Sequence, residues 1–206
     1  AREKFYTNND LKIRSLLKVL LEALCALDNE FGKNIAEKFC NSKIMEIKIM
    51  GLISCIKYNN SNSIKLLTKF YNEFKNDKIV LEKWFLIRSS YNNLYFDGIN
   101  SIKDVLKNKN FEYKNPNFVR AILGGFQNNN IELFHAKDNS GYKFVADQII
   151  LIDKINPQTA ARIITPMTNI SKFNNNTKNR MKKYLNLILK SNPSNDVFEV
   201  ISKSLN

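Results

Sequence analysis

The sequence predicts an all-α protein, an α-solenoid of antiparallel helix pairs of the HEAT or armadillo kind. Three observations support this fold class. Apolar residues recur at helical spacing along most of the chain, and the hairpin turns and apolar–polar alternation typical of strands are missing. The predicted loops are short and rich in Asn, so consecutive helices should pack as antiparallel neighbours. About twelve helices are expected, and because no clean repeat is found, the solenoid is inferred from element order alone.

The first helix is predicted from a stripe of apolar residues that face one side of the helix. The stripe consists of Ile13, Leu16, Leu17, Leu20, Leu24 and Leu27. Asn9 or Asp10 can cap the start of this helix. The same spacing predicts further helices over 30–40, 43–57, 63–75, 78–91 and 99–108. Of these, the helix over 63–75 can be capped by Ser61 or Asn62.

The helix over 78–91 is expected to bury one face, on which Trp84 is a core aromatic rather than a platform for a ligand. This face holds Val80, Trp84, Ile87 and Tyr91. Asp97 and Gly98 then interrupt the helical pattern before the next helix.

Two later helices begin with the same device, an Asn followed by a Pro, at Asn115-Pro116 and Asn156-Pro157. The Asn side chain caps the helix, and Pro fits the first helical position because no hydrogen bond from its nitrogen is needed there. Pro166 should kink or end the second of these helices. Residues 174–176 are expected to form a loop or a cap.

The C-terminal part is predicted to contain two helices. The first carries Met181, Tyr184, Leu185 and Ile188 at helical spacing and ends at Ser191-Asn-Pro193. The last helix covers about 195–204. No linker rich in Pro, Gly or Ser divides the chain, so residues 1–206 are predicted to be a single domain.

The net charge of +13 would suggest a nucleic acid as partner, but the composition argues otherwise. The chain has 26 Lys and only 6 Arg, together with 31 Asn and 23 Ile, which indicates an AT-rich genome rather than a binding patch. The densest basic cluster, over 178–183, is therefore interpreted as a solvated helix face. Nucleic acid is not expected as a partner. Nor is a membrane, because the apolar runs are too short to span one and no signal peptide is found.

The three cysteines, Cys25, Cys40 and Cys55, lie in apolar helical stretches and form no CxxC pair. An odd number without framework spacing is typical of buried free thiols in a reducing compartment. A cytoplasmic location is therefore predicted.

The residue inventory excludes several kinds of active site. The only histidine is His135, so neither HExxH nor a zinc site with two His ligands can be built. GxSxG and the P-loop signature are also missing. His135 is expected to order a long polar loop rather than to catalyse a reaction. Gly124 and Gly125 are expected to permit close helix packing.

Two arginines are the candidate functional residues. Arg120 and Arg162 each lie just inside a helix that begins with Asn-Pro, in a chain that otherwise uses Lys. A planar, permanently charged guanidinium suits the recognition of a carboxylate. The alternative, that each forms an ordinary structural ion pair, is left open by the sequence.

From residue 80 onward the motifs resemble those of a known family. In order they are Glu82-Lys-Trp-Phe85, Asn115-Pro-Asn117 with Arg120, Phe134-His-Ala-Lys-Asp-Asn-Ser-Gly-Tyr142, and Asn156-Pro-Gln-Thr-Ala-Ala-Arg162 with Pro166. This series resembles the C-terminal domain of aminopeptidase N, the bacterial-type alanyl zinc aminopeptidase. The family usually has Asp where this chain has Glu82, and Gly where it has Asn139. Asn tolerates the left-handed conformation that Gly would adopt, so the loop should survive.

The resemblance implies that this chain is the helical C-terminal domain of a larger multidomain enzyme. The zinc, the HExxH motif and the catalytic residues would belong to the N-terminal catalytic domains of the same polypeptide, which would be its partners. Consistent with this, the chain does not begin with Met and is expected to be a fragment. Alone it should bind no metal and hydrolyse nothing.

In that family this domain closes over the active site and walls an internal chamber for peptide substrates. The resemblance implies that Arg120 and Arg162 face the chamber and attract the carboxylate at the peptide's C-terminus. The alternative function is a free-standing helical-repeat module that binds protein or nucleic acid.

Overall fold

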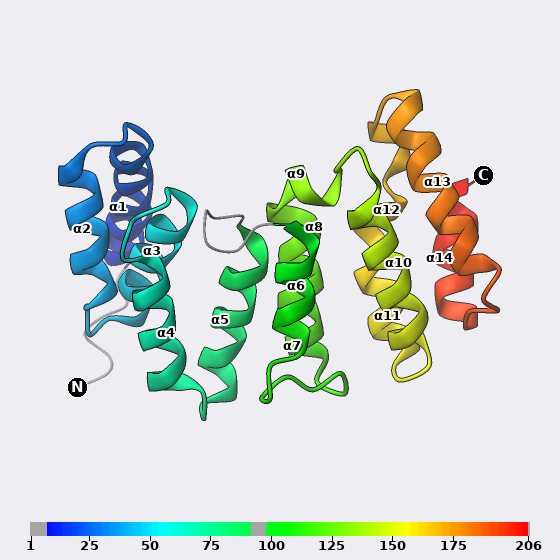
Figure 1. Cartoon of the computed structure of the whole chain (residues 1–206), viewed down its shortest axis with the longest axis horizontal. Coiled ribbons are helices and arrows are strands. Elements are labelled where there is room, and N and C mark those ends of the chain that lie inside the picture. Colours follow the sequence, from blue (N-terminus) through cyan, green and yellow to red (C-terminus); the bar gives the residue numbers. More distant parts are fainter. Residues whose placement is uncertain (1–7, 92–97, 206) are drawn as a thin grey trace. The chain divides into compact units, whose positions relative to one another are not determined.

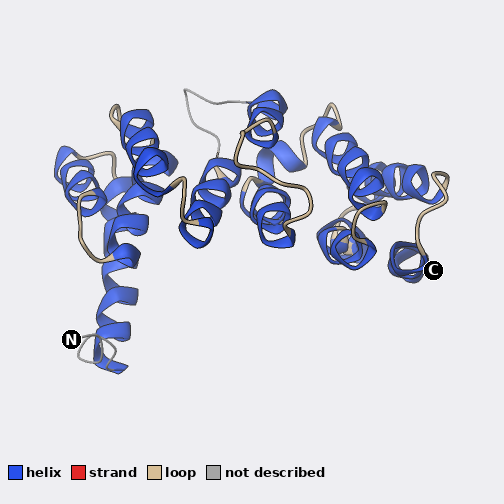
Figure 2. Ribbon diagram, turned by 90° about the horizontal axis from the view of Figure 1, so that it is seen from below, coloured by secondary structure: helices blue, strands red, loops and turns tan. Residues whose placement is uncertain are grey.

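The computed structural model describes residues 8–91 and 98–205. All regular elements in this part of the chain are helices, and Figures 1 and 2 show them joined by loops without a strand. The predicted all-α class is confirmed. The predicted interruption at Asp97 lies outside the described residues, but Gly98 has a φ of 71°, a left-handed conformation that favours glycine.

The described residues form two compact units. The first, residues 8–75, consists of α1 (Asn8–Ala26), α2 (Glu30–Cys40), α3 (Met45–Lys57) and α4 (Ser63–Phe74). The second covers 76–91 and 98–205, and its elements are α5 (Lys78–Ser90), α6 (Gly98–Leu106), α7 (Pro116–Val119), the π-helical turn η2 (Arg120–Gly124), α8 (Gly125–Asn129), α9 (Ile131–Phe134), α10 (Ser140–Asp153), α11 (Pro157–Ile163), α12 (Thr165–Thr168), the 3₁₀ turn η3 (Ile170–Lys172), α13 (Asn175–Leu189) and α14 (Asn195–Leu205). The single domain over residues 1–206 stays a prediction.

The buried face of α1 differs from the predicted stripe. Leu21 and Cys25 are buried against Ala36 of α2 and Cys55 of α3. Much of the predicted stripe is exposed instead, with exposed fractions of 58% for Leu16 and 73% for Leu27. Apolar residues lie all around α1, while α2 and α3 cover only one of its sides, so spacing alone selected the wrong face. In Figure 2 the N-terminal half of α1 extends beyond the other helices of this unit.

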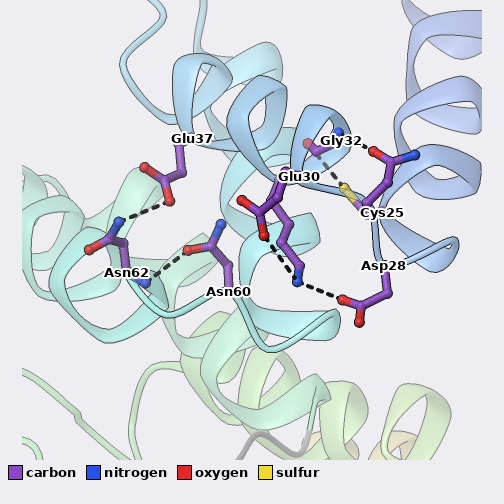
Figure 3. Close-up of polar contacts among 9 residues, drawn as sticks. Cys25, Asp28, Glu30, Gly32, Glu37, Asn60 and Asn62 are labelled. Atoms are coloured by element: carbon purple, nitrogen blue, oxygen red, sulfur yellow. Dashed lines mark hydrogen bonds and ion pairs between the residues drawn. The ribbon is translucent and has the colours of Figure 1, made fainter.

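Polar side chains hold the loops of the first unit, as Figure 3 shows. Asn29 caps α2 by accepting a hydrogen bond from the backbone nitrogen of Gly32 at 2.7 Å. Asn62 occupies the predicted cap position before α4 but makes no capping bond. Its amide nitrogen donates instead to Glu37 Oε1 at 2.9 Å, and thereby ties the α3–α4 loop to α2.

The buried face of α5 is also displaced from the prediction. Leu81, Phe85 and Ile87 are buried, whereas Trp84 is only half-buried. Phe85 occupies the core position, and the ring of Trp84 meets it edge-on, with 5.4 Å between the ring centroids. The prediction that Trp84 is a core aromatic is therefore correct only in part.

The adjacent glycines behave differently from each other. A Cβ on Gly125 would lie 2.9 Å from both Leu86 Cδ1 and Ser90 Oγ, so the absence of a side chain lets α8 pack closely against α5. This confirms the expected role for Gly125. A Cβ on Gly124 would meet only Arg120 Cγ, at 3.8 Å, which is ordinary contact. The expectation is therefore wrong for Gly124.

Both Asn-Pro helix starts are confirmed. The side chain of Asn115 accepts from the backbone nitrogens of Asn117 and Phe118, and that of Asn156 accepts from Thr159. The helix after Asn156 ends at Ile163, and Pro166 lies in the first turn of α12. Pro166 thus begins a new short helix, as expected of a residue that cannot continue the previous one.

Of the two C-terminal helices, α13 packs on α10, whereas α14 packs on α11, α12 and α13. Met181, Leu185 and Ile188 of α13 are buried, as their spacing predicts. Asp153, at the end of α10, accepts hydrogen bonds from the backbone nitrogen and the hydroxyl of Ser194, at 2.7 and 2.5 Å. This contact joins α10 to the start of α14.

Candidate functional site

A groove of about 500 Å³ opens on the second unit. Its lining includes two cations, Arg162 and Lys172, and several amide side chains, but no carboxylate. The lining residues are Gln127, Asn128, Ile131, Phe134, His135, Arg162, Thr165, Pro166, Asn169, Lys172 and Phe173. A site of this composition attracts an anion.

The loop between α9 and α10, which contributes His135 to the groove, is held by Arg180 of α13. The Nε of Arg180 donates to Asn139 Oδ1 at 2.6 Å. Its Nη2 donates to the backbone oxygen of His135 at 3.1 Å and to that of Ala136. These contacts use the planar fork of the guanidinium, which can donate in several directions at once.

At the junction of this loop with α10, Asn139 adopts a left-handed backbone conformation and Gly141 has no room for a side chain. Asn139 has a φ of 65°, the left-handed conformation that the sequence comparison with the family's Gly predicts. Gly141, the second residue of α10, lies so close to the end of α9 that a Cβ would be 2.4 Å from the backbone oxygen of Phe134. The Asn-Ser-Gly sequence therefore sets the direction in which the chain enters α10.

The ring of His135 is fixed by its neighbours. Its Nδ1 lies 2.6 Å from the hydroxyl oxygen of Tyr142, which is fully buried. The ring centroid lies 4.7 Å from that of Phe134 and 4.9 Å from that of Phe173. These contacts confirm that His135 orders the loop.

Burial favours the neutral forms of the His135 ring and the Tyr142 hydroxyl. Burial lowers the pKa of His135 below its ordinary value of 6.5, and the positive charge of Arg180 lowers it further. Burial raises the pKa of Tyr142. The guanidinium of Arg180 also lies over the Tyr142 ring, with its Cζ 5.3 Å from the ring centroid.

Arg162 lines the groove on α11 and is exposed. Among the described residues it has neither an ion-pair partner nor a hydrogen-bond partner for its side chain. Within the described part of the chain, Arg162 thus forms no structural ion pair, and its role stays a prediction. An arginine that has no internal partner is available to an anionic ligand.

Arg120 lies outside the groove lining. Its Nη2 donates to Asn117 Oδ1 at 2.7 Å, and no described carboxylate pairs with it. The segment that carries it, η2, packs against α11, which carries Arg162. The structure therefore brings the two segments together but places only Arg162 in the groove.

Sequence reasoning missed Arg180 and Lys172. The sequence groups Arg180 with the basic cluster over 178–183, which predicts a solvated helix face. That interpretation holds for the exposed Lys183 and is wrong for the half-buried Arg180. The available signal was the scarcity of arginine, the same signal that selected Arg120 and Arg162. Lys172 has no distinguishing signal among the 26 lysines.

Neither a metal centre nor a membrane span is found in the described residues. No group of three or more His, Cys, Asp or Glu side chains there could hold a metal ion. None of the described helices is both long and apolar enough to cross a bilayer. The side chains of the groove likewise do not fit zinc, because His135 is the only metal-ligating type among them.

Comparison with known proteins agrees with the helical architecture. Residues 2–206 match the family model described as "Domain of unknown function (DUF3458_C) ARM repeats". The aminopeptidase N of Haemophilus influenzae is 31% identical over 202 residues, which cover 97% of this chain and 23% of the relative. That of Caulobacter vibrioides is 30% identical, over 93% of this chain and 22% of the relative.

A solved structure shows the same fold. It is the crystal structure of Legionella pneumophila aminopeptidase A in complex with aspartic acid, with a TM-score of 0.84 and 30% identity over 93% of this chain and 23% of that one. The chain thus spans about a quarter of the length of the relatives it matches. By its match over residues 2–206, it belongs to the DUF3458_C family of ARM-repeat domains, and it is homologous to the corresponding part of aminopeptidase N.

Proposed function

We propose that residues 1–206 act as the non-catalytic C-terminal domain of a zinc-dependent aminopeptidase N. In this proposal the parent enzyme removes N-terminal residues from peptides, and this domain caps the active site and walls the substrate chamber. The homology to a quarter of each aminopeptidase N supports a parent of this kind. The zinc and the catalytic residues then belong to the other domains of the same polypeptide.

One observation carries the role of the groove. Arg162 and Lys172 face the same groove, its lining includes no carboxylate, and Arg162 has no partner among the described residues. Side chains arranged in this way suit the free carboxylate of a peptide C-terminus. Because both cations are exposed, each contact contributes only about 0.2–1 kcal/mol, so their effect is to orient peptides rather than to bind them tightly. Arg120, on the adjacent η2, adds to the positive field near the groove.

The test compares two ligands that differ only at the C-terminus, tri-alanine and tri-alanine amide. Binding to the ¹⁵N-labelled chain is followed by NMR chemical shifts. Tri-alanine should bind roughly threefold or more tightly than the amide, because a charge-assisted contact is lost in the amide. Arg162→Gln should remove this difference, and Lys137→Gln, at an exposed lysine outside the groove lining, should leave it unchanged. Equal binding of both peptides to the unmodified chain would refute the carboxylate role.

A second measurement tests the absence of catalysis. The purified chain, incubated with zinc, should retain no metal after gel filtration and should not hydrolyse an alanyl anilide. Retained zinc together with hydrolysis would contradict the assignment of the chemistry to other domains.

The alternative function, a free-standing module that binds nucleic acid, has its own test. Such a module would show an affinity for duplex DNA that falls steeply as the salt concentration rises.

A further inference from the structure

We infer that His135 is a ligand-binding residue of the groove, in which its Nε2–H donates a hydrogen bond to the carboxylate that Arg162 attracts. This inference rests on the proposed carboxylate role of the groove and adds a neutral, directional donor to its two cations. Three observations support it: the edge of the ring that faces the groove, the tautomer that the Tyr142 hydroxyl requires, and the burial that favours a neutral imidazole.

The ring of His135 joins the core to the groove. Tyr142, which contacts Nδ1, is fully buried, whereas His135 itself is half-buried and lines the groove. The Nδ1 edge therefore faces the core, and the opposite edge, which carries Nε2, faces the groove. Nε2 has no hydrogen-bond partner among the described residues. The two phenyl rings of Phe134 and Phe173 hold this orientation.

The buried hydroxyl of Tyr142 determines the tautomer. Within the described part of the chain, its only hydrogen-bond partner is His135 Nδ1. If Nδ1 carried the proton, the hydroxyl hydrogen of Tyr142 would be buried without an acceptor, which is costly. If the hydroxyl instead donates to an unprotonated Nδ1, both atoms of this buried contact are satisfied. The ring proton then lies on Nε2, which makes this atom a donor.

The ring of His135 favours its neutral form because of its surroundings. Arg180 of α13 donates to the His135 backbone oxygen, and Lys172 of η3 and Arg162 of α11 line the same groove. Burial, and after it the positive charge of Arg180, lower the pKa of His135 and so disfavour a further positive charge on the imidazole. His135 therefore contributes direction to the site, and the arginine and lysine contribute charge.

The chain offers a clean test because it has a single histidine. In a chain labelled with ¹⁵N-histidine, the imidazole nitrogen shifts should report a protonated Nε2 and an unprotonated Nδ1. Addition of tri-alanine should move the Nε2 resonance, and tri-alanine amide should move it far less. A protonated Nδ1 would overturn the inference.

Two further outcomes separate this inference from the proposed function. If tri-alanine binds with the expected preference over its amide but leaves Nε2 unmoved, the inference fails and the proposed function stands. If tri-alanine does not bind, or binds no better than the amide, both fail.

Variants supply an independent check. His135→Ala should weaken tri-alanine binding roughly threefold to tenfold, as for the loss of one hydrogen bond. His135→Gln, whose amide nitrogen can replace the Nε2–H donor, should recover most of the affinity. Lys137→Ala, at the exposed loop residue outside the groove lining, is the matched control. Failure of His135→Gln to bind better than His135→Ala, with thermal midpoints showing that both are folded, would assign His135 a structural role only.

Discussion

Arg180 donates to the backbone oxygen of His135 at 3.1 Å, so a side chain of α13 fixes the backbone of the residue that faces the groove. The same guanidinium binds Asn139 and Ala136. One side chain therefore holds the whole α9–α10 loop. The relation links the C-terminal helices to the site, although the two residues are far apart in sequence.

We expect Arg180→Ala to lower the free energy of unfolding by about 2–3 kcal/mol, because a charged donor and several loop acceptors lose their partners. Arg180→Lys should recover only part of this, because an ammonium cannot reproduce the geometry of the fork. Asn179→Ala, an exposed neighbour on α13, is the control and should change little. Urea denaturation measures all three variants. A loss below about 0.5 kcal/mol for Arg180→Ala would mean that the loop is held by other contacts.

The adjacent glycines provide a matched pair of substitutions. Gly125→Ala should destabilise the chain by about 1–3 kcal/mol, because its Cβ would lie 2.9 Å from Leu86 Cδ1 and Ser90 Oγ. Gly124→Ala should be neutral, or stabilising by up to about 1 kcal/mol, because Ala favours the helix and its Cβ meets nothing closer than 3.8 Å. Thermal unfolding of the two variants measures the difference. The reverse order would contradict the α5–α8 packing.

Stability should decrease when the pH falls from about 7.5 to 5.5. Burial and Arg180 lower the pKa of His135 in the folded chain, so the unfolded chain takes up the proton more readily. The loss begins near the unfolded pKa of about 6.5 and is complete below the folded pKa. Thermal midpoints across this range should fall less steeply for His135→Gln.

The carboxylate of Asp138 titrates below the pH range in which His135 takes up its proton. A backbone hydrogen bond from Ser140 lowers the pKa of Asp138 below its ordinary value of 3.8, so its contribution is lost only at more acidic pH. An identical slope between pH 7.5 and 5.5 in the wild-type chain and in His135→Gln would show that His135 is not the titrating group.

The thiols should differ in their rates of alkylation. Cys25 and Cys55 are buried and Cys40 is half-buried, with its Sγ 3.8 Å from that of Cys55. The hydrogen bond with Cys40, together with burial, raises the pKa of Cys55, and burial raises that of Cys25. Iodoacetamide at pH 8 should therefore label Cys40 first, because only a thiolate reacts. Peptide mass spectrometry gives the order, and faster labelling of Cys55 would contradict the packing of α2 on α3.

The alkylation experiment does not test the cytoplasmic location, which stays a prediction.

Local signals in the sequence determined the helices and several of their ends. Asn115 and Asn156 cap helices as predicted because a side-chain cap and a following Pro act over only a few residues. The left-handed Asn139 is local in the same way. The fold class and the family could thus be predicted from residues that are neighbours in the chain.

Tertiary structure decided which helix faces are buried and which residues form the groove. Apolar spacing placed Leu16 in the core, but the neighbours of α1 cover Leu21 and Cys25 instead, and spacing alone carries no information about what lies opposite. Arg120 and Arg162 follow the same Asn-Pro signal, yet only Arg162 lines the groove. From its sequence neighbours, Arg180 is one more cation on a solvated helix face, but in the structure it binds the His135 loop. A contact between residues about forty-five positions apart leaves no local pattern in the sequence.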